Sequence, residues 1–149
     1  MQIPASLGVF CAVRTPECEQ VMQYLLQACA DAGLMAYEFG PNTKNDPVLG
    51  NPEVIICLGG DGTILSRAAY AAERGIVLGG INMGHLGFLS ACGRNEVEQL
   101  VQSLASGTYV VHRRVMLEVR ACGADGCKVG NLALNEIALT RYQTGKMID

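Results

Sequence analysis

The residues Gly59-Gly60-Asp61-Gly62-Thr63 follow directly on the apolar run Val54–Leu58. Glycines at the start of a helix present bare backbone N–H groups, which bind anions such as phosphate. An aspartate in such a loop repels phosphate unless a metal ion lies between them, or unless Asp61 binds a hydroxyl while the amides hold the phosphates. This combination is typical of a phosphotransferase. The alternative is an ordinary Asp-Gly turn in which Thr63 caps the following helix.

A second glycine-rich segment, Gly79–Phe88, also follows an apolar run. Loops that follow parallel strands emerge at one edge of a sheet, where ligands bind, so we expect both segments to line one pocket. Asn82 offers an amide to a ligand, or it simply forms a turn. His85 is better explained as a surface side chain than as a phosphate ligand, because one histidine in a loop is seldom diagnostic.

A polar pair, Asn135-Glu136, interrupts the apolar run 132–139. Burying an unpaired carboxylate is costly. A ribose diol would satisfy both side chains, because Glu136 can accept from two hydroxyls while Asn135 donates and accepts. Neighbouring strand residues point to opposite faces, so the strand must bulge or end here if both contact one ligand. The alternative is that one of the two simply faces water.

Strands and helices alternate through the first hundred residues. Apolar runs predict strands at 7–13, 35–39, 54–58 and 76–81, and helical periodicity predicts helices at 17–32, 64–74 and 95–106. This alternation predicts an α/β fold with a doubly wound parallel sheet. The segment 40–52 contains three prolines, and we expect it to be a loop.

The pattern changes near Tyr109, where apolar and polar residues begin to alternate along 115–120. A turn at 123–126 and a second strand at 128–142 complete a predicted hairpin. We therefore expect an α/β nucleotide-binding domain at 1–108 and, at 109–149, the first hairpin of an incomplete β-rich domain. A lone hairpin is marginally stable in water, so we expect the chain to be truncated.

The composition excludes several classes of protein. Half of the 149 residues are hydrophobic, 17% are charged and the mean hydropathy is +0.24, which excludes wholesale disorder. A net charge of −3 argues against a nucleic-acid partner. No apolar stretch is long enough for a membrane span, and no targeting signal is evident.

The seven cysteines show no Cys-x-x-Cys spacing. Cys29 and Cys57 lie on apolar faces, where cysteine behaves as a small hydrophobic residue. Cys122 and Cys127 flank the predicted turn but would make a weak metal site, and we assign them no role. The pattern favours a reduced, cytoplasmic protein.

Three motifs in this order resemble those of the NAD kinase family: Gly59–Thr63, Gly80–Leu89 and Leu134–Glu136. The first alone is shared with diacylglycerol and sphingosine kinases, and a related form occurs in phosphofructokinases, so the second and third favour NAD kinase. The resemblance implies an α/β N-terminal domain followed by a β-rich domain. It also implies transfer of the γ-phosphoryl group of ATP, or of phosphate from polyphosphate, to the 2′-hydroxyl of the adenosine ribose of NAD, giving NADP.

The resemblance also implies roles for individual residues. Asp61 would be catalytic and engage the 2′-hydroxyl, and Phe88 matches a position lining the nucleotide pocket, although its sequence context suggests a core aromatic. The residues expected to bind ATP or NAD are Gly59, Gly60, Gly62, Thr63, Asn82, Phe88, Asn135 and Glu136. The family needs a divalent cation such as Mg²⁺ and usually forms dimers or tetramers. Phosphoryl transfer needs positioning and charge neutralisation more than a strong base, which suits an aspartate.

The family pattern continues with a further aspartate and a Gly-, Ser- and Thr-rich stretch that do not occur before Asp149. We therefore expect little or no kinase activity from this chain alone. Two alternatives remain open. One is a lipid kinase, although nothing between Gly79 and Leu89 suggests an apolar substrate pocket. The other is a non-catalytic dinucleotide-binding fragment or paralogue.

Overall fold

The computed structural model describes residues 2–40, 51–84, 87–123 and 126–137. Its centre is a five-stranded sheet in the order β2-β1-β3-β4-β5, and every neighbouring pair of strands is parallel. The strands are β1 (Leu7–Cys11), β2 (Ala36–Glu38), β3 (Val54–Leu58), β4 (Val77–Asn82) and β5 (Cys92–Gly93). The strand order reverses direction between β1 and β3, and this is the place where open α/β sheets bind ligands.

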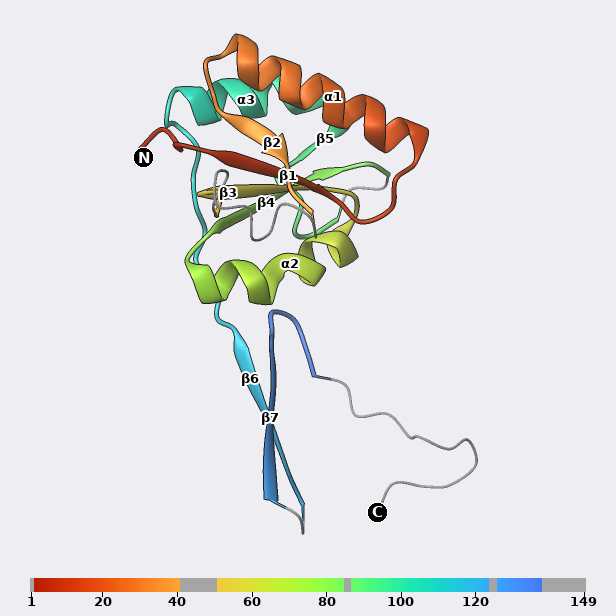
Figure 1. Cartoon of the computed structure of the whole chain (residues 1–149), viewed down its shortest axis with the longest axis vertical. Helices are drawn as coiled ribbons and strands as arrows, with labels where there is room; N and C mark the ends of the chain where they lie inside the picture. Colours follow the sequence, from red (N-terminus) through yellow and green to blue (C-terminus); the bar gives the residue numbers. More distant parts are fainter. Residues whose placement is uncertain (1, 41–50, 85–86, 124–125, 138–149) are drawn as a thin grey trace.

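Helices cover both faces of the sheet (Figure 1). Two of them, α1 (Pro16–Asp31) and α3 (Val97–Ala105), lie side by side on one face, with a short 3₁₀ helix, η1 (Arg94–Glu96), leading into α3. The opposite face is covered by α2 (Asp61–Arg74). The expected doubly wound α/β fold is confirmed.

Strand β3 shows why the apolar runs of this sheet are continuous. All five of its residues are buried. Val54, Ile56 and Leu58 pack in the core beneath α1 and α3, whereas Ile55 and Cys57 pack in the core beneath α2. Successive side chains point to opposite faces of a strand, so helices on both faces require apolar residues at every position.

The helix boundaries differ from the prediction at the site where chemistry is expected. Helix α2 begins at Asp61, three residues before the expected start, with Gly60 as its N-cap and no capping side chain. The alternative in which Thr63 caps this helix is therefore wrong. A carboxylate in the first turn is favoured by the positive end of the helix dipole, which allows the helix to begin at Asp61. The helix ends at Gly75, whose φ of 66° is in the left-handed region, as expected.

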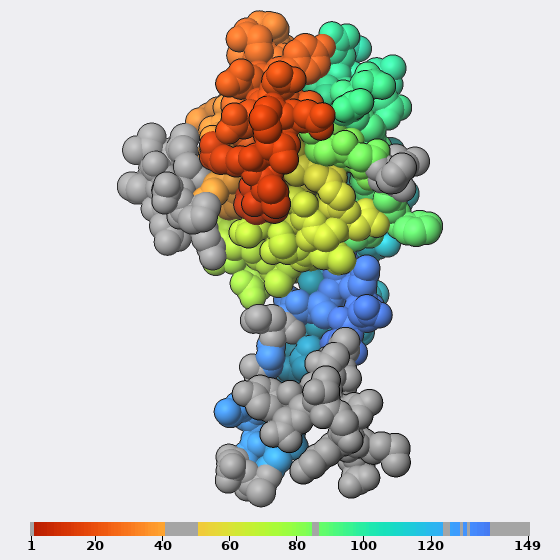
Figure 2. Space-filling view, turned by 90° about the vertical axis from the view of Figure 1, so that its right-hand side faces the viewer, coloured from red at the N-terminus to blue at the C-terminus, as the bar shows by residue number. Residues whose placement is uncertain are grey.

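After α3 the chain forms an antiparallel pair, β6 (Leu117–Gly123) and β7 (Gly126–Ala133), joined at the predicted turn. The pair extends away from the sheet on the side of α2, and β7 contacts α2 (Figures 1 and 2). Strand β7 ends at Ala133, so the prediction of a strand at 134–137 is wrong. The rest of that prediction, 138–142, lies outside the described residues, as do residues 41–50 of the expected loop.

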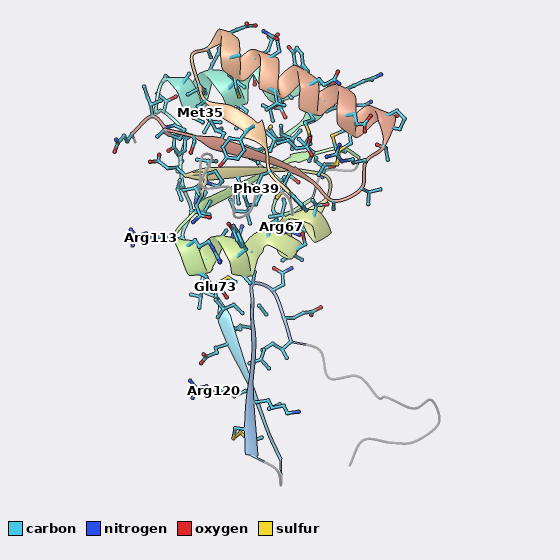
Figure 3. All side chains as sticks on the ribbon, in the orientation of Figure 1. Met35, Phe39, Arg67, Glu73, Arg113 and Arg120 are labelled. Carbon is cyan, nitrogen blue, oxygen red and sulfur yellow. A yellow bond between two sulfur atoms is a disulfide. The ribbon has the colours of Figure 1, made fainter. Side chains whose placement is uncertain are left out.

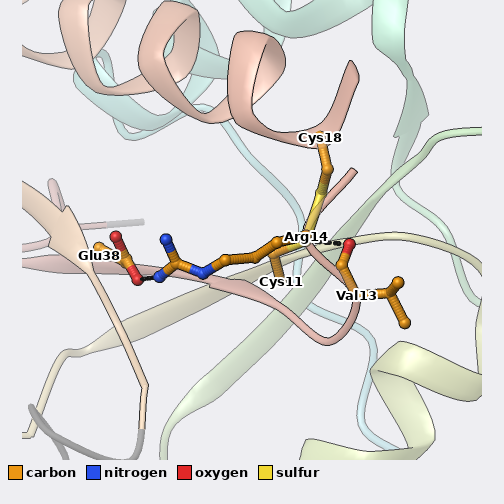
Figure 4. Close-up of polar contacts among 5 residues, drawn as sticks. All are labelled: Cys11, Val13, Arg14, Cys18 and Glu38. Carbon is orange, nitrogen blue, oxygen red and sulfur yellow. Dashed lines mark hydrogen bonds and ion pairs between the residues drawn. A yellow bond between two sulfur atoms is a disulfide. The ribbon is translucent and has the colours of Figure 1, made fainter. Parts of the chain in front are cut away.

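The structure contains two disulfides, Cys11–Cys18 and Cys122–Cys127, so the expectation of reduced cysteines is wrong for these pairs. The first joins the end of β1 to the first turn of α1, beside the ion pair of Arg14 with Glu38 (Figure 4). The second joins residues that face each other across β6 and β7. Both pairs span a short turn, which is the only sequence signal for them. Among the described residues, no helix combines the length and apolar character of a membrane span.

Candidate functional site

Asp61 lies where β3 meets α2, at the carboxyl edge of the parallel sheet. Both of its carboxylate oxygens accept backbone hydrogen bonds from the segment after β4. The Phe88 amide donates to Oδ2 at 2.9 Å, and the Leu89 amide donates to Oδ1 at 3.1 Å. The expectation that the first two glycine-rich segments meet at one edge is therefore confirmed. The carboxylate is fixed in orientation, and an ionised carboxylate has further lone pairs with which to accept bonds from a ligand.

The three glycines that flank Asp61 have different steric surroundings. Gly59 has a φ of 150°, and a Cβ at this position would lie 2.9 Å from Thr63 Cβ and closer still to its hydroxyl. Gly60 and Gly62 are exposed, and a Cβ at either would meet open space. Gly59 therefore shapes the turn, whereas Gly60 and Gly62 leave the N-terminus of α2 uncovered. This is the geometry expected of an anion-binding loop.

Asn82 is buried, with 4% of its surface exposed, and it fixes the second segment. Its Oδ1 accepts from the Gly84 amide at 2.8 Å, and its Nδ2 donates to Ser90 Oγ at 3.2 Å. The structure thus supports the turn-forming interpretation of Asn82, and contact with a ligand stays a prediction. His85 lies outside the described residues.

Phe88 is 97% exposed, so its interpretation as a core aromatic is wrong. Its backbone amide is held by Asp61, while its side chain lies at the surface. An exposed ring next to a polar site is free to stack on a planar ligand. Its role in a nucleotide pocket stays a prediction.

Asn135 and Glu136 are exposed and follow the end of β7. The condition set by the sequence, that the strand must bulge or end if both contact one ligand, is met by this end. Within the described part of the chain, neither residue forms a hydrogen bond to the first two segments. Their neighbour Leu134 lines a groove of about 930 Å³ together with Phe88 and Leu89, so the second and third motifs border one hollow, whereas no residue of Gly59–Thr63 lines it.

Arg67 is a residue that sequence reasoning missed. It extends from α2 toward the sheet (Figure 3), and its guanidinium carbon lies 4.0 Å from the centre of the Phe10 ring. Its Nε is buried without a hydrogen-bond partner. Burial raises the pKa of the nearby Cys57 thiol to about 12, against a lowering effect of the Arg67 charge. Cys57 is therefore a neutral core residue and is unsuited to act as a nucleophile.

A divalent cation would need ligands from both the protein and the substrate. Among the described residues, no three His, Cys, Asp or Glu side chains lie close enough together to hold a metal ion. Mg²⁺ in phosphate-transfer sites is commonly held by one or two carboxylates together with substrate phosphates. A single clamped aspartate beside an anion-binding loop fits that mode of binding.

The fold is an open parallel α/β sheet, and the candidate site around Asp61 lies at the carboxyl edge of that sheet. Residues 50–109 match the ATP-NAD kinase N-terminal domain. The NAD kinase of Cytophaga hutchinsonii is 35% identical over 132 residues, covering 87% of this chain and 43% of the relative. The NAD kinase of Thermoanaerobacter sp. is 38% identical over 117 residues, covering 78% and 41%. By these matches the chain is similar to the N-terminal part of NAD kinases, as the three motifs indicate.

A solved structure agrees on the fold. Yeast NADH kinase, in a crystal structure with NADH, matches with a TM-score of 0.68 at 19% identity, over 90% of this chain and 48% of that protein. The chain spans less than half the length of the curated relatives named above.

Proposed function

We propose that this chain is the N-terminal part of an NAD(H) kinase, which transfers the γ-phosphoryl group of ATP, or phosphate from polyphosphate, to the 2′-hydroxyl of the adenosine ribose of NAD or NADH. The observation that carries the proposal is the clamped carboxylate of Asp61, next to exposed glycines at a helix N-terminus. The kinship with NAD kinases supports this assignment of substrate.

In this proposal Asp61 orients the acceptor hydroxyl and receives its proton as the phosphoryl group transfers. Phosphoryl transfer proceeds through a loose transition state, so a correctly placed hydroxyl and a neutralised phosphate matter more than a strong base. The backbone of Gly59–Thr63 contacts phosphates, and a bound Mg²⁺ would supply charge neutralisation there. The fixed orientation of Asp61 supports this role, because a hydroxyl can be aligned only by a group that is itself held.

The dinucleotide would lie along the groove that the second and third motifs border. Phe88 would stack on the adenine ring, Asn82 would offer its amide, and Asn135 with Glu136 would bind a ribose diol. The exposure of Phe88, Asn135 and Glu136 supports this arrangement, because each is accessible to a ligand. We further propose a nucleotide-binding unit at 1–108 and a separate β-rich unit starting at 109. A cytoplasmic homo-oligomer is proposed from the family resemblance alone.

The first test measures NADP formation and NAD binding by the 149-residue chain. We expect NAD binding with little or no NADP formation from either ATP or polyphosphate. Robust NADP formation would overturn the proposed dependence on a C-terminal part. Diacylglycerol offered as the phosphoryl acceptor tests the lipid-kinase alternative, because a lipid kinase would phosphorylate diacylglycerol and not NAD.

The second test joins this chain to the C-terminal part of the Cytophaga hutchinsonii NAD kinase and compares Asp61 with Asp61→Asn. We expect the substitution to lower turnover by about 10²–10⁴-fold while NAD affinity stays within a few-fold, as for removal of a proton acceptor. Unchanged turnover would exclude Asp61 as the catalytic residue. A fused protein that binds NAD with and without the substitution, but never forms NADP, would favour the binding-fragment alternative.

A further inference from the structure

The segment between β4 and β5 is anchored at its base by hydrogen bonds that involve no ligand. Asn82 binds the Gly84 amide and the Ser90 hydroxyl, as described above. The Ala91 amide donates to the carbonyl of Gly80 at 2.8 Å, so the returning chain is tied to β4. The amides of Phe88 and Leu89 are therefore presented from a fixed frame rather than from a free loop.

Asp61, in the first turn of α2, binds two amides of this segment. Each carboxylate oxygen accepts one amide, at 2.9 Å and 3.1 Å, and charge-assisted bonds of this kind are stronger than neutral ones. The contact joins residues 27 and 28 positions apart in sequence. We name this pair of bonds the Asp61 latch.

Gly87 precedes the two donors. A side chain at this position would clash with the Asp61 carboxylate. A Cβ at this position would lie 2.6 Å from Asp61 Cγ and 2.9 Å from Oδ2, and closer still to Oδ1. Its φ is not among the positive values of the described glycines, so another residue could adopt its backbone conformation. The space at Gly87 is thus reserved for the Asp61 carboxylate.

We propose that Gly87 is a positioning residue: its missing side chain allows the Asp61 latch to close and thereby fixes the carboxylate toward the acceptor hydroxyl. The catalytic part of this inference rests on the proposed function. The latch itself does not, because it is formed without any ligand. A side chain at 87 would push the carboxylate away from the amides or push the amides away from the carboxylate.

The test is a double-mutant cycle in the 149-residue chain, measured by urea unfolding. Gly87→Ala is made in the parent and in Asp61→Ala, and Gly84→Ala is the matched control. Gly84 is exposed in the same segment, and a Cβ there would meet nothing within 4 Å. In the parent chain, we expect Gly87→Ala to lower the urea midpoint clearly. In the Asp61→Ala background, we expect Gly87→Ala to lower the midpoint no more than Gly84→Ala does. An equal loss in both backgrounds would overturn the proposal.

Amide hydrogen exchange gives a second measurement that needs no stable Gly87 variant. We expect the Phe88 and Leu89 amides to exchange at least tenfold faster in Asp61→Ala. In Asp61→Asn we expect only one of the two amides to do so, because the side-chain nitrogen of asparagine cannot accept a hydrogen bond. Exchange unchanged at both positions would overturn the latch. Neither measurement involves a nucleotide, so failure of the proposed function leaves both results interpretable.

The fused kinase described above tests the catalytic part. We expect Gly87→Ala to lower kcat about tenfold or more while the KM for NAD is kept, since misplacement of a catalytic group costs rate more than binding. Gly84→Ala, whose added Cβ meets nothing within 4 Å, should lower kcat less than Gly87→Ala does. A Gly87→Ala protein with parental kcat would overturn the positioning role.

Discussion

The sheet region, residues 7–105, and the hairpin, residues 117–133, are built on opposite principles. Strand β3 is buried at every position, whereas β6 is exposed at six of its seven. The sheet is held by apolar layers on both faces, and the hairpin by cross-strand pairing and the Cys122–Cys127 disulfide. The proposed catalytic carboxylate belongs to the first region, and the proposed ribose-binding pair follows the second. A rigid frame thus holds the proposed reacting group, while the proposed ribose-binding pair follows a region with little packing of its own.

The largest expected difference between the two regions is in the cost of removing a leucine side chain. Leu25 on α1 is fully buried, and Leu117 on β6 is 42% exposed. Leu25→Ala should lower the free energy of unfolding by about 3–5 kcal/mol, because it leaves a cavity in the core. Leu117→Ala should cost less than about 1 kcal/mol, because it removes little buried area. Urea unfolding followed by circular dichroism measures both, and similar costs would show that the hairpin is packed as firmly as the sheet.

The same contrast explains how much could be predicted from the sequence. Strand β3 was predicted to the residue, because two-sided burial demands an unbroken apolar run and the glycines after it end the strand. The second hairpin strand was predicted to continue to 142, but β7 ends at Ala133. Apolar residues after that point suggested burial, yet Ile137 is 46% exposed. An apolar run predicts a strand only where a second surface is present to cover it.

The site was predictable in its residues but not in its contacts. Asp61 and the second glycine segment were expected at one edge, since both follow parallel strands. The direct bonds from the Phe88 and Leu89 amides to Asp61 were not foreseen, because backbone donors carry no mark in the sequence. The spacing of Gly87 before Phe88 was visible, but its steric reason depends on a side chain 26 positions away. Arg67 was missed because a helical arginine is ordinarily a solvated residue.

A smaller difference between the regions should appear at alkaline pH, because only the sheet region holds buried free thiols among the described residues. Burial raises the pKa of Cys57 to about 12, from 9.0 in the unfolded chain, while the Arg67 charge lowers it. Between these values the unfolded chain releases a proton that the folded chain keeps. Stability therefore falls as the pH rises through this window, by up to about 1.4 kcal/mol per pH unit.

The measurement is the slope of unfolding free energy against pH between 9 and 11. Cys57→Ala should reduce this slope, whatever its effect on stability at neutral pH, and leave the part due to Cys29 and Cys92, whose pKa values burial raises to about 11. The matched control replaces both Cys122 and Cys127 with alanine, which should leave the slope unchanged because disulfide sulfurs do not titrate. A slope insensitive to Cys57→Ala would mean that this thiol is more hydrated than its burial implies.

The smallest expected effect tests whether charge adds to the difference between the regions. Each region has an exposed ion pair, Arg14 with Glu38 beside β1 and Arg120 with Glu118 on β6. Arg120 projects sideways from the hairpin (Figure 3), and 66% of its side chain is exposed, compared with 59% for Arg14. Exposed pairs contribute about 0–1 kcal/mol, because water and salt screen the charges.

We therefore expect Arg14→Gln and Arg120→Gln to change the free energy of unfolding by less than about 0.5 kcal/mol each, and by less at 0.5 M than at 0.05 M salt. Unfolding in urea at the two salt concentrations measures this. Equal small effects would leave apolar burial as the source of the contrast between sheet and hairpin. A loss above about 1 kcal/mol in Arg120→Gln alone would instead show that the hairpin depends on its charges where the sheet depends on its core.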